Sequence, residues 1–250
     1  MLLPLADNNP LRSIRHAYVN WTVIGLCVAV FVYEISLPER TAELFALAYG
    51  AIPAVLFGKA ELAPELARLP GWVTLVSSMF LHGGIMHIAG NMLFLWVLGD
   101  NVEDALGHKR YVAFYLACGV FAALAHALAD PGSRVPMVGA SGAISGVIGS
   151  YLILHPRAPI KTLVWLFIVE LPAWLMLGIW AVFQFLSAFG SAGGAGGGVA
   201  WWAHVGGLVA GLALIAPLRR KGMALFDRGL APAPRRGPRI AMRKGPWSWR

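Results

Sequence analysis

The sequence has little charge and almost no cysteine. Asp, Glu, Lys and Arg make up 13% of the 250 residues, against about 25% in an ordinary soluble domain. The two cysteines, Cys27 and Cys118, both lie in apolar runs, and we interpret them as packing residues rather than as a disulfide, a metal site or a nucleophile. The scarcity of charge, with a mean hydropathy of +0.67, argues against a soluble globular protein.

The chain also begins without a basic segment ahead of its first apolar run, so we expect no cleavable signal or transit peptide. Its hydrophobic residues, 58% of the total, gather in runs close to the roughly 20 residues that a spanning helix needs. The six such segments are Tyr18–Leu37, His82–Leu98, Tyr111–Ala129, Val138–Leu154, Thr162–Phe189 and Ala200–Leu218. These segments predict an all-α polytopic membrane protein with six transmembrane helices. The shorter apolar stretch 44–57 suits an interfacial or re-entrant piece.

The distribution of basic residues predicts the orientation. Six spans place sixteen of the Lys and Arg residues on the side of the two termini and four on the other side, so both termini should face the cytoplasm. We expect a cytoplasmic segment over 1–16, a membrane domain over 17–218 and a basic, disordered tail over 219–250. The tail supplies most of the net charge of +8 and should contact anionic lipid. We expect no nucleic-acid partner, because no basic folded surface accompanies the tail.

A few polar residues fall inside the apolar segments, where they mark functional sites by default. Ser141 shares one helix face with small residues, and His204 shares a face with Gly207 and Gly211. If the two faces pack together, the histidine can act as the base that activates the serine. Plain helix packing, or a structural role for the histidine, is the alternative. The G-x-S-x-G elbow of soluble hydrolases is excluded, because Ala143 stands where either serine would need a glycine.

Two further polar residues lie four apart in the second segment. His87 and Asn91 therefore face the same way on a helix, and both can donate hydrogen bonds to an oxyanion. The alternative is that they hydrogen-bond a loop. Several other polar or ionisable residues are flanked by apolar sequence without such a pattern: Glu34, His82, His126, Glu170 and Gln184.

Three separated motifs match a known family. They are GASG at 139–142, AHVGGLVAG at 203–211 and HIAGN at 87–91. With these motifs, over about residues 10–220, the chain resembles the rhomboid intramembrane serine proteases. The resemblance implies that Ser141 is the nucleophile, His204 the base, and His87 and Asn91 the oxyanion donors. It also implies a packing role for four glycines and a structural hydrogen-bonding role for Glu103. The four glycines are Gly139, Gly142, Gly207 and Gly211.

The resemblance further implies a six-helix rhomboid-like bundle with a first loop, about 39–81, partly embedded in the membrane. Its substrates would be transmembrane segments of membrane proteins, cleaved near the outer face without metal or cofactor, and a bacterial cytoplasmic membrane is the simplest location. Two positions depart from the family pattern. Val73 follows Trp72 where the family often has arginine, and Ser145 stands where some members place an aromatic residue against the histidine ring.

Two other classes of function remain open at this point. A catalytically dead rhomboid-like protein would bind client helices without cutting them, although such proteins usually lack the serine or the histidine. A transporter would show inverted repeats and paired charges in its spans, and the sequence has no internal repeat. The glycine-rich stretch 187–198 is either a flexible connection or a mobile cap over the site.

Overall fold

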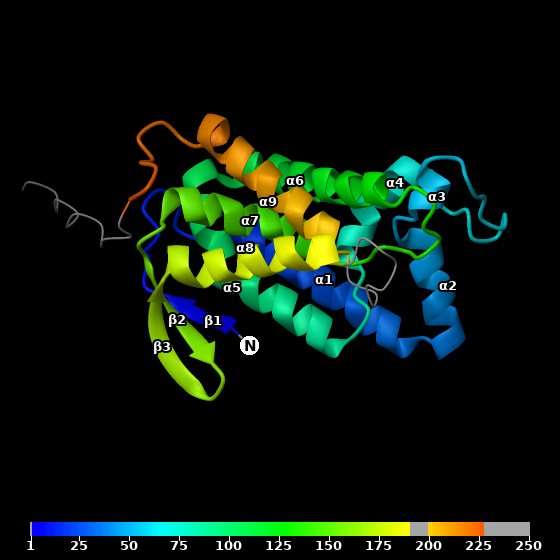
Figure 1. Ribbon diagram of the computed structural model, residues 1–250, viewed down its shortest axis with the longest axis horizontal. Helices are drawn as coiled ribbons and strands as arrows, with labels where there is room; N and C mark the ends of the chain where they lie inside the picture. The colour runs from blue at the N-terminus through cyan, green and yellow to red at the C-terminus, as the bar shows by residue number, and fades with distance from the viewer. Residues whose placement is uncertain (1, 191–199, 228–250) are drawn as a thin grey trace, which may run out of the picture.

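The computed structural model describes residues 2–190 and 200–227. Most of the proposed cap and the basic tail beyond residue 227 therefore lie outside the described residues. The elements are β1 (Leu2–Asp7), α1 (Tyr18–Ser36), α2 (Glu39–Tyr49), α3 (Pro53–Leu56), α4 (Gly71–Ser77), η1 (Ser78–Phe80), α5 (Ile85–Leu106), α6 (His108–Ala129), α7 (Ser141–Leu154), β2 (Pro159–Val164), β3 (Phe167–Pro172), α8 (Ala173–Gly190) and α9 (Trp201–Leu218). The long helices run along one common direction (Figure 1). We call the end with the strands the sheet end, and the end with α2, α3 and α4 the loop end.

Within residues 2–190 and 200–227, five helices are long and apolar enough to cross a membrane: α1, α5, α6, α8 and α9. The fourth expected span, Val138–Leu154, is helical only from Ser141, and its 14 residues reach about 21 Å, short of a hydrocarbon core of about 30 Å. Most of α7 is buried among its neighbours. The structure is thus that of a mostly helical membrane protein in which α7 is too short to be counted as a membrane span.

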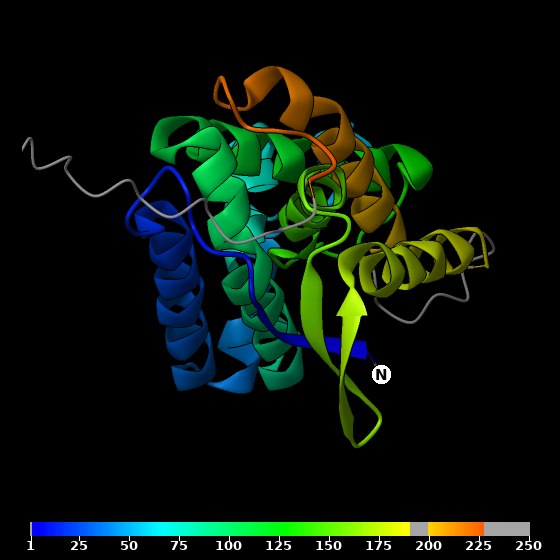
Figure 2. The same ribbon diagram turned by 90° about the vertical axis from the view of Figure 1, so that its left-hand side faces the viewer.

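The fifth expected span, Thr162–Phe189, is wrong in its first part. Residues 159–172 form an antiparallel hairpin of β2 and β3, and the helix begins only at Ala173. The strand β1 pairs with β2 and completes a three-stranded sheet in the order β1-β2-β3 (Figure 2). The expectation of an all-α chain is corrected accordingly. The hairpin and α8 form one continuous apolar run in the sequence. Periodicity cannot distinguish a strand from a helix in a short run of apolar residues.

The helix α5 extends beyond its expected end at Leu98 to Leu106. Its last two turns carry buried acids whose acceptor atoms are all occupied by the chain. Asp104 accepts hydrogen bonds from the backbone N–H groups of Arg12, Ser13 and Ile14, at 2.6 to 2.9 Å. With these three donors, the carboxylate is buried at little cost in free energy. The polar sequence after Leu98 gave no sign that the helix continues there.

The segments at both edges of the expected membrane domain belong to the folded body. β1 lies in the sheet, and the backbone N–H of Arg220 donates to the carbonyl oxygen of Ala105. Asp227 forms an ion pair with Arg12 at 3.0 Å and a 2.6 Å contact with His155 Nδ1. The described parts of 1–16 and 219–227 therefore close the sheet end.

We predict that Asp7 makes stability depend on pH. Burial raises the pKa of its carboxyl from 3.8 to about 7, and nearby Asp100 adds to the shift, although the Tyr151 hydroxyl donates to it. The folded protein thus holds a proton that the unfolded chain releases, so stability falls as pH rises from about 4 to about 7.

The substitution Asp7→Asn should remove this loss. Each pKa unit of this shift changes the free energy of unfolding by about 1.4 kcal/mol. We therefore expect the variant to melt at a higher temperature than wild type at pH above 7 and at the same temperature in acid. Thermal unfolding in detergent at several pH values measures this. Parallel pH curves for the two proteins would contradict it.

Candidate active site

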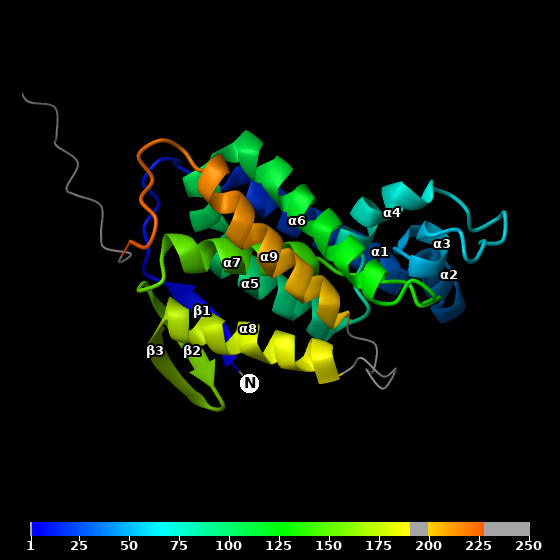
Figure 3. The ribbon, with the colours of Figure 1, turned by 45° about the horizontal axis from the view of Figure 1, so that its top comes forward.

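The helices α7 and α9 touch backbone to backbone. A Cβ atom on Gly207 would collide with the carbonyl oxygen of Gly142, and one on Gly211 with that of Gly146. Further along, the Ser150 hydroxyl donates to the carbonyl oxygen of Gly211 at 3.1 Å. Figure 3 shows α9 lying along α7, with α6 on its other side. The expected small faces do pack together, and Gly146 belongs to the contact as well.

This close approach brings together the two side chains expected to react. The Ser141 hydroxyl lies 2.8 Å from His204 Nε2. Ser141 is the first residue of α7, and His204 lies in the first turn of α9. Both are partly exposed, so the pair is open to a reacting group near the loop end of the bundle.

The other nitrogen of the histidine has a partner from a third helix. His204 Nδ1 lies 2.7 Å from Oε1 of Gln184, which is on α8 and only 4% exposed. An amide oxygen can only accept, so Nδ1 carries the proton and Nε2 is left to accept from the serine. No acid of the described chain contacts this ring by a hydrogen bond or ion pair. The sequence marked Gln184 only as a polar residue in an apolar run.

Two tryptophan rings lie beside the His204 imidazole, which the sequence leaves without an aromatic residue four positions after the serine. Trp180 of α8 lies 6.1 Å from it between ring centroids, and Trp201 of α9 lies 5.9 Å away, edge-on. Ser145, which stands at that fourth position, donates a 2.7 Å hydrogen bond to the carbonyl oxygen of Ser141. The support for the ring therefore comes from α8 and α9.

The candidate oxyanion donors lie in the first two turns of α5. A Cβ atom on Gly139 would stand 2.7 Å from His87 Cε1 and 3.7 Å from the Ser141 hydroxyl oxygen, which places the His87 ring beside the serine. Gly139 has φ of +124°, a conformation that favours glycine. Asn91 is 8% exposed, and its Nδ2 has no hydrogen-bond partner among the described residues.

One further glycine and one acid complete the predicted set. A Cβ on Gly142 would meet Ala122 of α6 at 2.6 Å before it met α9, so this glycine admits α6 as well. Glu103 is fully buried and accepts from the backbone N–H groups of Val19 at 3.1 Å and Asn20 at 2.7 Å. Its Oε1 also lies 2.5 Å from His108 Nδ1. It thereby joins α1, α5 and α6 at the sheet end, far from the serine.

The sequence of this region matches a described protein family. The profile of the Rhomboid domain covers residues 70–221, which is more than half of the chain and includes every residue of the candidate site. This chain belongs to the rhomboid family. Its five apolar helices agree with an integral membrane protein of that family.

Several proteins named as rhomboids are similar to parts of this rhomboid-family chain. Rhomboid protease GluP of Bacillus subtilis is 39% identical over 98 residues, which is 39% of this chain and 18% of GluP. Rhomboid protein 1, mitochondrial, of Saccharomyces cerevisiae is 30% identical over 146 residues, 56% of this chain and 40% of the yeast protein. Rhomboid protease GlpG of Klebsiella pneumoniae is 26% identical over 197 residues, 78% of this chain and 60% of GlpG. The chain spans less than two thirds of each relative.

The glycine contact yields a test of the site's architecture. In Gly211→Ala the new methyl group would overlap the backbone of α7, so the two helices must separate. We expect a lower unfolding temperature and a weaker reaction of Ser141 with an active-site probe. The matched control is Gly25→Ala on α1, where a Cβ meets nothing within 4 Å and alanine favours the helix by roughly 1 kcal/mol. Equal stability of the two variants would contradict the backbone contact.

Proposed function

We propose that this rhomboid-family protein is an intramembrane serine endopeptidase that uses Ser141 and His204 as a catalytic dyad. The observation that carries the proposal is the 2.8 Å contact between the Ser141 hydroxyl and His204 Nε2. The amide oxygen of Gln184 on the opposite nitrogen fixes the tautomer that this chemistry needs. Relatives named as rhomboid proteases support the same reaction class.

The reaction begins when His204 Nε2 takes the Ser141 proton while the serine oxygen attacks a peptide carbonyl. The tetrahedral intermediate collapses when the imidazolium returns that proton to the leaving amine, which leaves an acyl-serine. A water molecule, deprotonated by the same histidine, then hydrolyses the ester and restores the hydroxyl. Gln184 takes the orienting place that an aspartate holds in soluble triads.

The negative charge of the intermediate needs donors that are already in place. We assign this role to His87, Asn91 and the backbone N–H of Ser141. The Asn91 Nδ2 group, which has no partner within the described chain, supports the assignment, because a buried donor without a partner is costly unless another species binds it. The N-terminus of α7 adds backbone N–H groups that have no acceptor within the helix.

The substrates we infer are transmembrane segments of membrane proteins, cut close to one face of the bilayer. Ser141 lies toward the loop end, and the basic residues gather at the sheet end, which the positive-inside rule assigns to the cytoplasm. Cleavage would then occur near the outer face of a bacterial cytoplasmic membrane. We take 17–218 as the protease domain, in which α7 is a membrane-embedded helix that joins the five apolar spans. The basic tail is a contact for anionic lipid.

A fluorophosphonate probe tests the dyad directly. Wild type in mild detergent should become labelled at Ser141, while Ser141→Ala and His204→Ala should lose the label and the cleavage of a model transmembrane substrate. Ser145→Ala is the matched control. Among the described residues, the hydroxyl of this neighbouring serine donates only to the Ser141 carbonyl oxygen, so its removal should leave labelling intact. A folded wild type that neither labels nor cleaves would favour a binding protein without catalysis.

The role of Gln184 has its own test. Replacing it with Met keeps the volume and removes the acceptor, so we expect labelling to slow by roughly two- to tenfold, the worth of one neutral hydrogen bond of about 0.5–1.5 kcal/mol. The maximal rate of inactivation should fall while the probe concentration for half-maximal rate stays constant. Gln184→Glu, which keeps an acceptor oxygen at the same length, should recover the rate. A Met variant as fast as wild type would remove Gln184 from the mechanism.

A further inference from the structure

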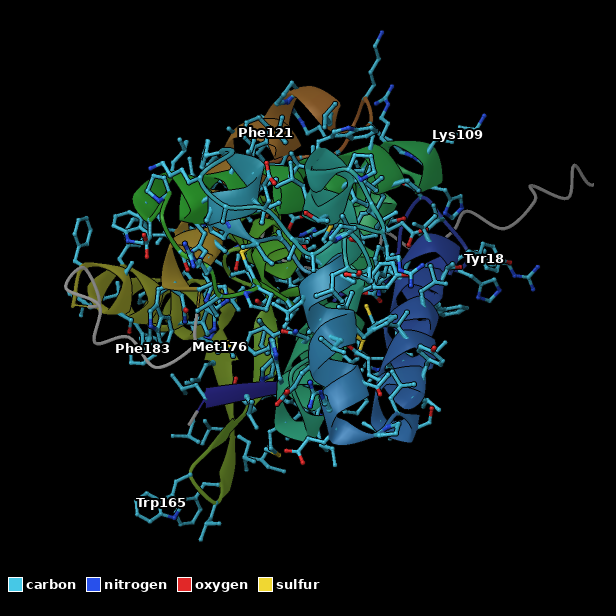
Figure 4. All side chains as sticks on the ribbon, turned by 90° about the vertical axis from the view of Figure 1, so that its right-hand side faces the viewer. Tyr18, Lys109, Phe121, Trp165, Met176 and Phe183 are labelled. Atoms are coloured by element: carbon cyan, nitrogen blue, oxygen red, sulfur yellow. The ribbon has the colours of Figure 1, made fainter. Side chains whose placement is uncertain are left out.

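The hairpin of β2 and β3 presents an apolar tip that no other part of residues 2–190 and 200–227 covers. Residues 163–169 read LVWLFIV, seven apolar residues in succession. Trp165, Leu166, Phe167 and Ile168 are each between 65% and 79% exposed. Figure 4 shows Trp165 at the far tip of the hairpin, away from the helices. The catalytic proposal gives these side chains no role.

We propose that this tip inserts into the lipid interface at the sheet end of the bilayer. Residues on a strand alternate between the two faces of a sheet, so seven successive apolar residues expose apolar side chains on both faces. A protein partner would cover one face of such a thin hairpin, whereas lipid surrounds both. The occupant that fits this pattern is therefore the membrane itself.

The position of the hairpin agrees with this occupant. Its two ends connect to α7, which ends at Leu154, and to α8, which begins at Ala173, so the hairpin leaves the bundle where helices reach the membrane surface. It projects sideways from the bundle, across the direction of the helices (Figures 1 and 2), and its tip is displaced toward the loop end (Figure 1). The exposed apolar face of α8, which includes Phe183 at 57% exposed, continues the same lipid-facing surface.

Charge along the hairpin marks how deep it lies. Lys161 and Glu170 are cross-strand partners at its base, and no charged residue follows toward the tip. Among the described strands, none pairs with the outer edge of β3, and an open sheet edge does not occur within hydrocarbon. The tip therefore lies among the headgroups and upper chains, where tryptophan side chains are preferred. Basic residues at the sheet end complement anionic headgroups: Arg15, Arg157, Lys161 and Lys221.

The backbone at the tip points the same way. Trp165 has φ of +57°, in the left-handed region that glycine occupies without cost and a bulky residue does not. A two-residue turn of this kind favours glycine at its first central position. The backbone conformation at this position therefore disfavours tryptophan. Insertion of its side chain into the interface supplies an interaction that compensates for this conformational cost.

Spin labels in vesicles of phosphatidylethanolamine and phosphatidylglycerol test the depth of the tip. A nitroxide on Leu166→Cys should collide several-fold more often with oxygen, relative to a water-soluble nickel chelate, than one on Lys161→Cys at the hairpin base. Phe183→Cys on α8 is the lipid-facing reference. The native Cys27 and Cys118 are fully buried, so labelling occurs at the introduced thiol. The measurement requires no protease activity, so its result is independent of the catalytic proposal.

Two outcomes of the collision measurement would overturn the proposal. Equal nickel accessibility at positions 166 and 161 would place the tip in water. An immobilised label at 166 that neither reagent reaches would place it against a second copy of the chain.

A variant at position 165 distinguishes the contribution of the tryptophan side chain to membrane insertion from its effect on folding. Trp165→Gly relieves the positive φ, so its unfolding temperature in detergent should equal or exceed that of wild type. In vesicles, the label on Leu166→Cys should then shift toward nickel accessibility, because the interfacial anchor is gone. An unchanged depth in a stable Trp165→Gly protein would also overturn the proposal.

Discussion

The contact between the backbones of α7 and α9 is the constraint on which the rest of the structure depends. In lipid there is little hydrophobic gain from bringing two helices together, so close packing and hydrogen bonds between them hold the pair. Gly207 and Gly211 leave no side chain between the helices, and Ser150 ties the pair further along. Any wider spacing would separate Ser141 from His204, whose contact is 2.8 Å.

The neighbouring helices complete this pair without adding a charge. α8 contributes Gln184 and Trp180 around His204, and α5 contributes His87 and Asn91 on the other side of the serine. A neutral amide orients the imidazole at a smaller desolvation cost than a carboxylate buried in the membrane. Two buried acids, Glu103 and Asp104, instead serve architecture at the sheet end, where they accept backbone N–H groups.

Patterns within single segments made part of this structure predictable. The apolar runs identified α1, α6 and α9 closely, and the small-residue spacing around Ser141 and His204 anticipated a contact between segments 63 residues apart. Features that depend on a distant partner were not predictable. The hairpin pairs with β1, and Gln184 contacts His204. The buried end of α5 is stabilised by backbone N–H groups of residues 12–14. Hydropathy gives no information about such partners.

The pairing of β1 with β2 also determines when the protein can close. β1 is synthesised before its partner strand β2, which follows α1, α5, α6 and α7 along the chain. Arg12 likewise can pair with Asp227 only after residue 227 has been made. Contacts so distant in sequence form late, because the intervening chain must first be ordered. The early helices therefore enter the membrane with β1 unpaired. The sheet end assembles only after the chain has passed α9, in the same final stage that brings His204 to Ser141.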